Sequence, residues 1–184
     1  MKNVSFILVL AFLVSCVTSK QQNETPSNAF MQLVDSNSFN IHSQWAEPQY
    51  TAAFAQVSNL GLFGTDNIGR QIDIRSIKNF LRFRNDSVSA RFPFYGERQM
   101  GSSSSNLDQG ISFDGLAKDL KIEQKGSIYQ ISFHIKDSKS RSEKYDVIVR
   151  INSKLYSNIS ISSTHRYNIR YKGRVSKKAD TSTP

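Results

Sequence analysis

Alternating apolar and polar residues form the main pattern of the chain after residue 77. Several segments there place an apolar side chain at every second position, which is the period of a strand with one buried face. The clearest are residues 88–94, 129–135 and 145–151, with turn-forming pairs such as Asn85-Asp86 and Lys125-Gly126 between strands. The pattern predicts a mainly β fold: an antiparallel meander of about eight strands that closes into a barrel or splits into a sandwich.

The first half of the domain is less regular. Apolar residues at helical spacing predict a short N-terminal helix over residues 28–35. Residues 39–45 alternate and predict a strand that ends before Pro48. Residues 49–71 fit no single period, and residues 95–110 have the glycine and serine content of a long loop.

The N-terminal segment has the order of a bacterial lipoprotein signal. A lysine at position 2 precedes about 11 mostly apolar residues, whereas a membrane-spanning helix needs ~20. A lipoprotein signal has an aliphatic residue three positions before a cysteine and a small residue directly before it, and Leu13 and Ser15 fit. The thiol of Cys16, the only cysteine, is therefore expected to carry the lipid.

Two other interpretations of this segment stay open. Cys16 belongs to a leader that is removed, or the chain is an ordinary secreted protein of a eukaryote, since Asn23, Asn85 and Asn158 each begin a glycosylation sequon. Sequons arise by chance in a chain rich in asparagine and serine, so the lipoprotein interpretation is favoured. The expected location is the cell envelope, lipid-anchored at the outer membrane and facing the periplasm.

The organisation that follows is simple. Residues 1–15 are the expected lipoprotein signal peptide, and residues 16–28 are the lipidated cysteine and a flexible tether. Residues 29–175 are long enough for a single β-rich domain with its own core. Residues 176–184 are expected to be a disordered basic and polar tail.

The net positive charge of the chain suggests which class of partner the protein binds. The formal net charge is +9, which beside a membrane favours an anionic lipid, a glycan or an envelope protein as partner. Nucleic acid is not expected, because an exported lipoprotein rarely meets it. The densest basic cluster includes Arg166, Arg170, Lys172 and Arg174, of which the last three are candidate binding residues. A solvated strand face is the alternative interpretation.

A second candidate site is the segment of residues 91–98 (RFPFYGER). Pro93 marks a strand edge or bulge, and Gly96 permits a sharp turn into the long loop. Its aromatic rings are suited to stacking and its charged groups to an anionic ligand. The candidate binding residues are Arg91, Phe94, Tyr95, Glu97 and Arg98. The alternative is a strand end whose aromatic residues plug the core.

Catalytic and metal-binding patterns are weak. His42, His134 and His165 stand alone, without the spacing of a metal site, and neither a nucleophile elbow nor a P-loop occurs. The sequence therefore predicts no cofactor and a non-enzymatic binding domain anchored in the envelope by lipid. The alternatives are a structural or docking subunit of an envelope complex and, less favoured, a hydrolase.

The order of several short motifs resembles the domain-of-unknown-function family 4251, small envelope lipoproteins of Bacteroidetes-type bacteria. The resemblance covers essentially the whole domain. It departs at Phe92, where leucine is usual, and at Asn152-Ser153, which replaces an Asn-Gly turn. It implies a β-rich envelope lipoprotein and transfers no catalytic residue. The matching elements are residues 29–41, Pro48 and residues 92–96, 110–113 and 169–173.

Overall fold

The computed structural model describes residues 28–61, 70–100, 110–140 and 142–176. The predicted signal peptide, nearly all of the tether, Cys16 and nearly all of the tail lie outside these residues. The described part is mainly β, as predicted. Its elements are α2 (Asn28–Ser36), β1 (Ser38–Pro48), α3 (Ala52–Asn59), β2 (Ile72–Asp73), β3 (Phe80–Arg84), β4 (Ser87–Phe92), β5 (Ile111–Leu116), β6 (Lys118–Lys125), β7 (Ile128–Lys136), β8 (Lys144–Asn152), β9 (Tyr156–Ser163) and β10 (Ile169–Ser176).

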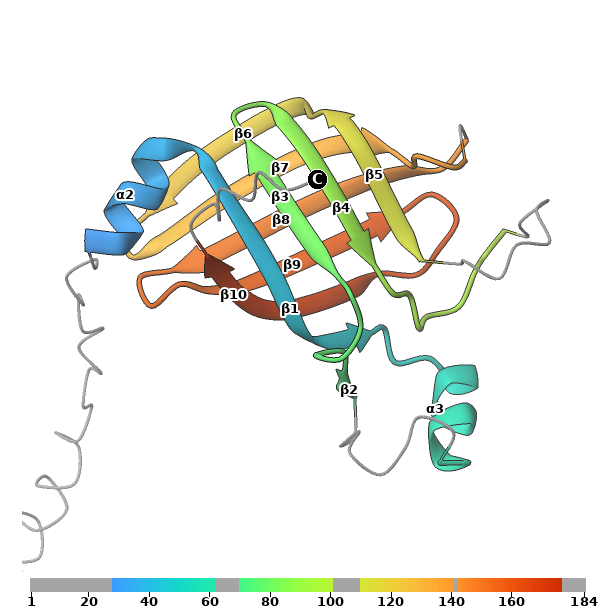
Figure 1. Ribbon diagram of the computed structural model, residues 1–184. Coiled ribbons are helices and arrows are strands. Elements are labelled where there is room, and N and C mark those ends of the chain that lie inside the picture. The colour runs from blue at the N-terminus through green and yellow to red at the C-terminus, as the bar shows by residue number, and fades with distance from the viewer. Residues whose placement is uncertain (1–27, 62–69, 101–109, 141, 177–184) are drawn as a thin grey trace, which may run out of the picture.

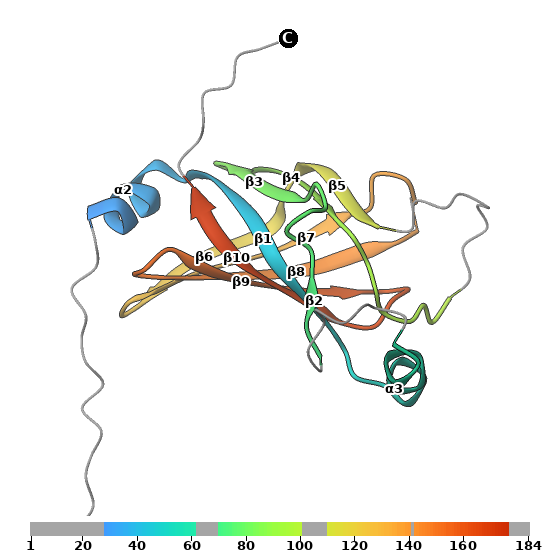
Figure 2. The same ribbon diagram turned by 60° about the horizontal axis from the view of Figure 1, so that its bottom comes forward.

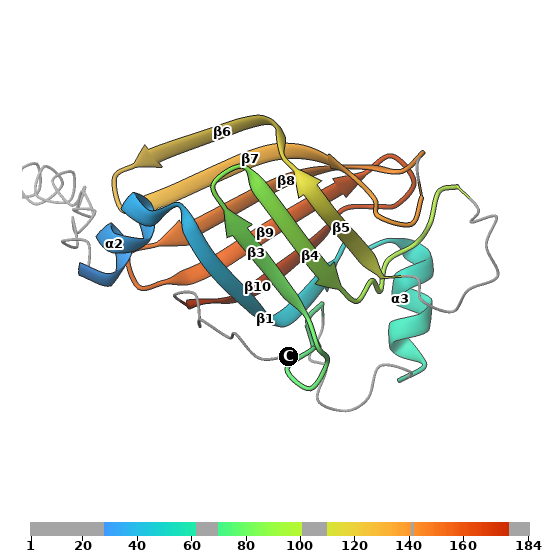
Figure 3. The same cartoon turned by 45° about the horizontal axis from the view of Figure 1, so that its top comes forward.

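The strands form one antiparallel sheet that curls until it is nearly closed into a barrel (Figures 1 and 3). Its order is β5-β4-β3-β1-β10-β9-β8-β7-β6, with β2 pairing β1. β5 and β6 lie at the two ends of this order, yet only Ala117 separates them along the chain. If β5 and β6 are taken as one bent strand and β2 is left aside, eight strands follow one another around the barrel, and β1 pairs with β10. The meander is confirmed, as a barrel.

Inward side chains fill the barrel. The rings of Phe92 and Tyr171 stack with centroids 4.4 Å apart, and those of Phe39 and Phe83 with centroids 5.3 Å apart. Burying such rings is a large part of the favourable free energy of folding. Figure 2 shows β1 and β4 crossing β7 and β8 at an angle. The interior is thus occupied by side chains of the protein itself, and room for a ligand lies on the outer surface.

Helix α2 covers one end of the barrel, where Phe30 and Leu33 are buried (Figure 1). The Tyr129 hydroxyl donates to the side-chain oxygen of Asn37, 2.7 Å away, and ties the end of this helix to β7. This helix has the predicted position. Within the described residues, no helix is long and apolar enough to cross a membrane.

Two details of the N-terminal half differ from the sequence pattern. Strand β1 continues through Pro48, whose missing N–H is tolerated at the last residue of the strand. The ambiguous segment contains α3, whose N-cap Thr51 accepts a hydrogen bond from the Phe54 N–H at 3.1 Å. Only Phe54 of this helix is buried, so its apolar periodicity was too weak to predict it.

Candidate functional site

Four neighbouring strands present polar side chains on one outer face of the barrel. Arg150 on β8 is opposite Asn158 on β9, Asn158 is opposite Lys172 on β10, and Lys172 is opposite Trp45 on β1. Because adjacent strands lie about 4.8 Å apart, this row extends over roughly 14 Å. Antiparallel registry thus gathers residues that are more than 100 positions apart in the sequence.

The outward direction of Trp45 depends on a β-bulge. Ile41 and Ser43 point into the barrel and are fully buried, so a strict period of two would send Trp45 inward as well. The register with β10 shifts between Ser43 and Trp45. This extra residue reverses the alternation, so that Ala46 is buried and Trp45 faces outward.

Asn79 and Gly173 stabilise the bulge from its two sides. The buried Asn79 side chain accepts from the Ser43 N–H at 2.9 Å and donates to the Ser43 carbonyl at 3.0 Å and the Ile77 carbonyl at 2.9 Å. On the β10 side, a Cβ atom on Gly173 would lie 2.2 Å from the carbonyl oxygen of His42. Only glycine permits this close backbone approach.

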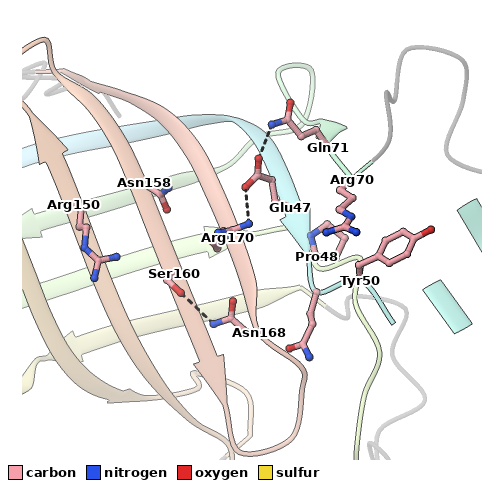
Figure 4. Close-up of a pocket in the computed structure, with 11 residues that line it drawn as sticks. Glu47, Pro48, Tyr50, Arg70, Gln71, Arg150, Asn158, Ser160, Asn168 and Arg170 are labelled. Atoms are coloured by element: carbon pink, nitrogen blue, oxygen red, sulfur yellow. Dashed lines mark hydrogen bonds and ion pairs between the residues drawn. The ribbon is translucent and has the colours of Figure 1, made fainter. Parts of the chain in front are cut away.

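Two adjoining hollows cover this face, with volumes of about 860 Å³ and 410 Å³. Both are lined by Arg150 and Asn158, and we call them together the outer groove. Figure 4 shows the larger hollow, with Arg150 on one side and Tyr50 and Arg70 on the other. Amide and hydroxyl groups lie between them; Asn168, for example, donates to the Ser160 hydroxyl at 3.1 Å. The larger hollow is therefore mainly polar.

Arginine side chains lie against the aromatic rings of the groove. The guanidinium of Arg70 is 4.4 Å from the ring centre of Tyr50, and that of Arg75 is 5.5 Å from Trp45. The ring of Tyr156 lines the smaller hollow, and the Arg174 guanidinium, outside the hollow, lies 4.2 Å from its ring centre. Tyr156 is 46% exposed. Cation–π contact holds each ring in place while part of it remains accessible.

Glu47 supplies a negative charge at the β1 side of the groove. Its carboxylate lies 2.6 Å from the Lys172 ammonium and 3.4 Å from the Arg170 guanidinium, and it accepts from the Gln71 amide at 2.6 Å. Burial alone would raise the pKa of Glu47, but the hydrogen bonds from Lys172 and Gln71 and the charges of Lys172 and Arg170 together outweigh burial and lower it. Glu47 is therefore ionised at neutral pH, and two groove cations already hold a carboxylate.

The family model described as "Domain of unknown function (DUF4251)" matches residues 21–175. The chain belongs to this family. Comparison with curated proteins and with solved structures gives no match. The motifs that carried the resemblance lie in α2 and β1, at the end of β4, at the start of β5 and in β10, and the DUF4251 domain is thus the barrel itself.

The DUF4251 barrel places the three basic candidates of β10 together on one face. Arg170 and Lys172 line the outer groove, and Arg174 lies beside it against Tyr156. Arg166 is different, because its side chain is only 3% exposed and forms a buried ion pair with Glu143. Counting Arg166 with the surface cluster was therefore wrong; it precedes β10 and points into the end of the barrel.

The candidate residues of the 91–98 segment close that same end. Phe94 and Tyr95 pack against the core, and the Arg166 guanidinium lies 5.0 Å from the Phe94 ring centre. Burial raises the pKa of the Tyr95 hydroxyl. The Glu97 carboxylate accepts from the Thr51 hydroxyl, which ties this segment to the start of α3. These contacts favour the plug interpretation over an open aromatic rim.

The remaining candidates of that segment point elsewhere. Arg98 lies 3.8 Å from the Glu143 carboxylate and pairs through its backbone with Arg166. Arg91 is exposed on β4, which is separated from β10 in the sheet by β3 and β1. The segment therefore does not join the outer groove. Among the described residues, no group of three His, Cys, Asp or Glu side chains is arranged to hold a metal ion.

Sequence reasoning missed several residues of the groove. The sequence pattern predicts a regular strand through Trp45 and does not single out Arg150, Tyr156 or Glu47, all of which line the groove. One pattern was informative: Arg150, Asn158 and Lys172 all occupy the polar phase of their strands. Without the strand order, nothing in that pattern shows that these three positions are neighbours.

Proposed function

We propose that this protein is a lipid-anchored envelope protein whose barrel binds a glycan in the outer groove. The observation that carries the proposal is the combination of partly exposed, cation-stacked aromatic rings with amide, hydroxyl and basic groups on neighbouring strands. Sugars offer apolar ring faces and many hydroxyls, and such a surface matches both. A lipid tail would need an apolar cavity, whereas the barrel interior is filled with side chains.

The alternatives fit the groove and the strand edges less well. A hydrolase of the common glycosidase type needs two carboxylates on either side of the bond, and the described lining of the groove contains Glu47 alone. A docking subunit could use the edge of β6. That strand carries Lys118, Lys121 and Lys125, and lysines on an edge strand oppose pairing with another chain. Glycan binding by a non-enzymatic domain is therefore preferred.

A matched pair of variants tests the groove. Tyr156→Ala/Arg174→Ala removes a ring of the groove and the cation that stacks on it from outside. Phe80→Ala/Arg82→Ala removes the same arrangement from the outer face of β3. We expect the first variant to lose tenfold or more in affinity and the second to bind like wild type. An aromatic contact contributes about 0.5–1.5 kcal/mol and a hydrogen bond to a charged group about 1.5–3 kcal/mol.

The measurement is affinity electrophoresis of the full-length protein in detergent through gels that contain neutral or acidic polysaccharides. Circular dichroism establishes that both variants are folded. If no polysaccharide retarded the wild-type protein, or if the two variants lost affinity equally, the groove would not be the glycan site.

The anchor has an independent test. Cys16→Ala removes the only thiol, so we expect the protein to leave the membrane fraction and to incorporate no labelled palmitate. Ser15→Ala, which keeps a small residue before the cysteine, is the control and should remain anchored and labelled. Membrane attachment of Cys16→Ala at the wild-type level would exclude the lipid anchor.

A further inference from the structure

The charges of the outer groove are unequal. Its described lining contains four basic residues, Arg70, Arg150, Arg170 and Lys172, and one acidic residue, Glu47. Glu47 is shared by Arg170 and Lys172. Arg150 donates to the neutral side-chain oxygen of Gln130 at 2.8 Å, and Arg70 stacks on Tyr50. Within the described residues the groove therefore keeps an excess of positive charge.

The Glu47 contacts show what this charge can hold. A single carboxylate receives the Lys172 ammonium at 2.6 Å and lies 3.4 Å from the Arg170 guanidinium. Both cations are about half exposed, with side chains 44% and 58% accessible, whereas the Glu47 side chain is 8% accessible. The solvent side of each cation is thus open to a second carboxylate from outside.

We propose that the glycan bound in the outer groove is acidic, a chain of uronic acid units whose carboxylates bind Arg150 at one side and compete with Glu47 for Lys172 at the other. This inference rests on the proposed function and gives it a ligand class. Asn158 lies between Arg150 and Lys172 in the row and offers an amide to sugar hydroxyls. A cation at each side of the groove, paired with a carboxylate of the glycan, fixes the position of the glycan chain.

Two substitutions have opposite expected effects. Arg150→Gln removes a cation whose described partner is neutral, so we expect about tenfold weaker binding of an acidic glycan. Glu47→Gln removes the internal competitor for Lys172 and Arg170 while its amide oxygen can still accept from Gln71, so we expect binding several-fold tighter. Arg82→Gln removes an exposed arginine of β3 and should change nothing.

The probes are polygalacturonate, hyaluronan and alginate, each compared with its methyl-esterified form, which keeps the sugar backbone and removes the charge. Trp45 is the only tryptophan, so its fluorescence in the full-length protein reports binding in the groove. Vesicles of phosphatidylglycerol in phosphatidylcholine test an anionic lipid surface. Thermal unfolding of each variant shows that it is folded, and Arg150→Gln keeps the test decisive if Glu47→Gln unfolds.

We expect at least one acidic polymer to bind tenfold or more tightly than its ester, with affinity that falls as salt rises. Equal binding of acid and ester would overturn the acidic class and leave glycan binding intact. Binding of none of the six polymers would count against the proposed function itself. If Arg150→Gln weakened binding to the anionic vesicles but not to any acidic polymer, the inference would be overturned in favour of lipid. If Glu47→Gln bound the acidic polymers more weakly than wild type, Glu47 would not compete with the glycan for Lys172.

Discussion

Replacing Asn79 by alanine is expected to lower the free energy of unfolding by about 3–5 kcal/mol, because each buried polar group left without a partner costs about 1–3 kcal/mol. The Asn79 side chain contacts the N–H and carbonyl of the fully buried Ser43 and the carbonyl of Ile77. The two Ser43 groups lie at the bulge, where β1 pairs with neither β3 nor β2. The asparagine amide takes the place of the missing strand.

Urea unfolding followed by circular dichroism and by Trp45 fluorescence measures this effect. The control is Asn168→Ala, which removes an amide that bonds the Ser160 and Ser162 hydroxyls on the outer face and should cost less than about 1 kcal/mol. The folded Asn79→Ala protein should also bind glycan more weakly, since Trp45 is aimed by the bulge. Equal unfolding midpoints for the two variants would show that Asn79 does not stabilise the bulge.

The fold was largely predictable because most strands bury one face. Strands such as β7 and β8 bury every second side chain, so the sequence period and the structural period are the same. Closure into a barrel depends on β1 pairing with β10, which are far apart in the chain. Local patterns contain no information on that pairing, so the choice between barrel and sandwich needed the structure.

The outer groove was only partly predictable, for the same reason. Arg170, Lys172 and Arg174 were found because they alternate with buried residues of a single strand. Trp45 was not found, because the bulge that turns it outward depends on Asn79 and on Gly173, and both lie outside β1. Glu47 was missed since an acidic residue near a strand end has no distinctive pattern.

The bulge also connects stability with the proposed function. Bulges, strained backbone and buried polar residues are typically retained where they hold a side chain in a particular position. Here the same register shift that exposes Trp45 requires a buried asparagine and a glycine, two residues that do not strengthen an ordinary strand. A regular strand would bury Trp45 and dispense with both. We infer that the outward position of Trp45 is what the bulge provides.

Replacing Arg166 by methionine is expected to cost about 3–5 kcal/mol, the usual effect of removing one member of a buried ion pair. The Arg166 and Glu143 side chains are 3% and 2% exposed and form two hydrogen bonds, of 2.7 Å and 3.1 Å. Arg166 also donates to the Gly110 carbonyl at 3.1 Å and lies against Phe94. Its loss leaves the Glu143 charge buried, with Arg98 3.8 Å away.

A double variant separates the loss of the ion pair from the cost of leaving the Glu143 charge buried. Arg166→Met/Glu143→Gln removes both charges, so we expect it to be more stable than Arg166→Met alone, because the Glu143 charge that has lost its main partner is gone. Arg82→Met, at an exposed arginine, should cost no more than about 0.5 kcal/mol. If Arg166→Met cost no more than Arg82→Met, the pair would not stabilise the barrel end. The Phe94 and Tyr95 segment would then have to be held by its apolar packing alone.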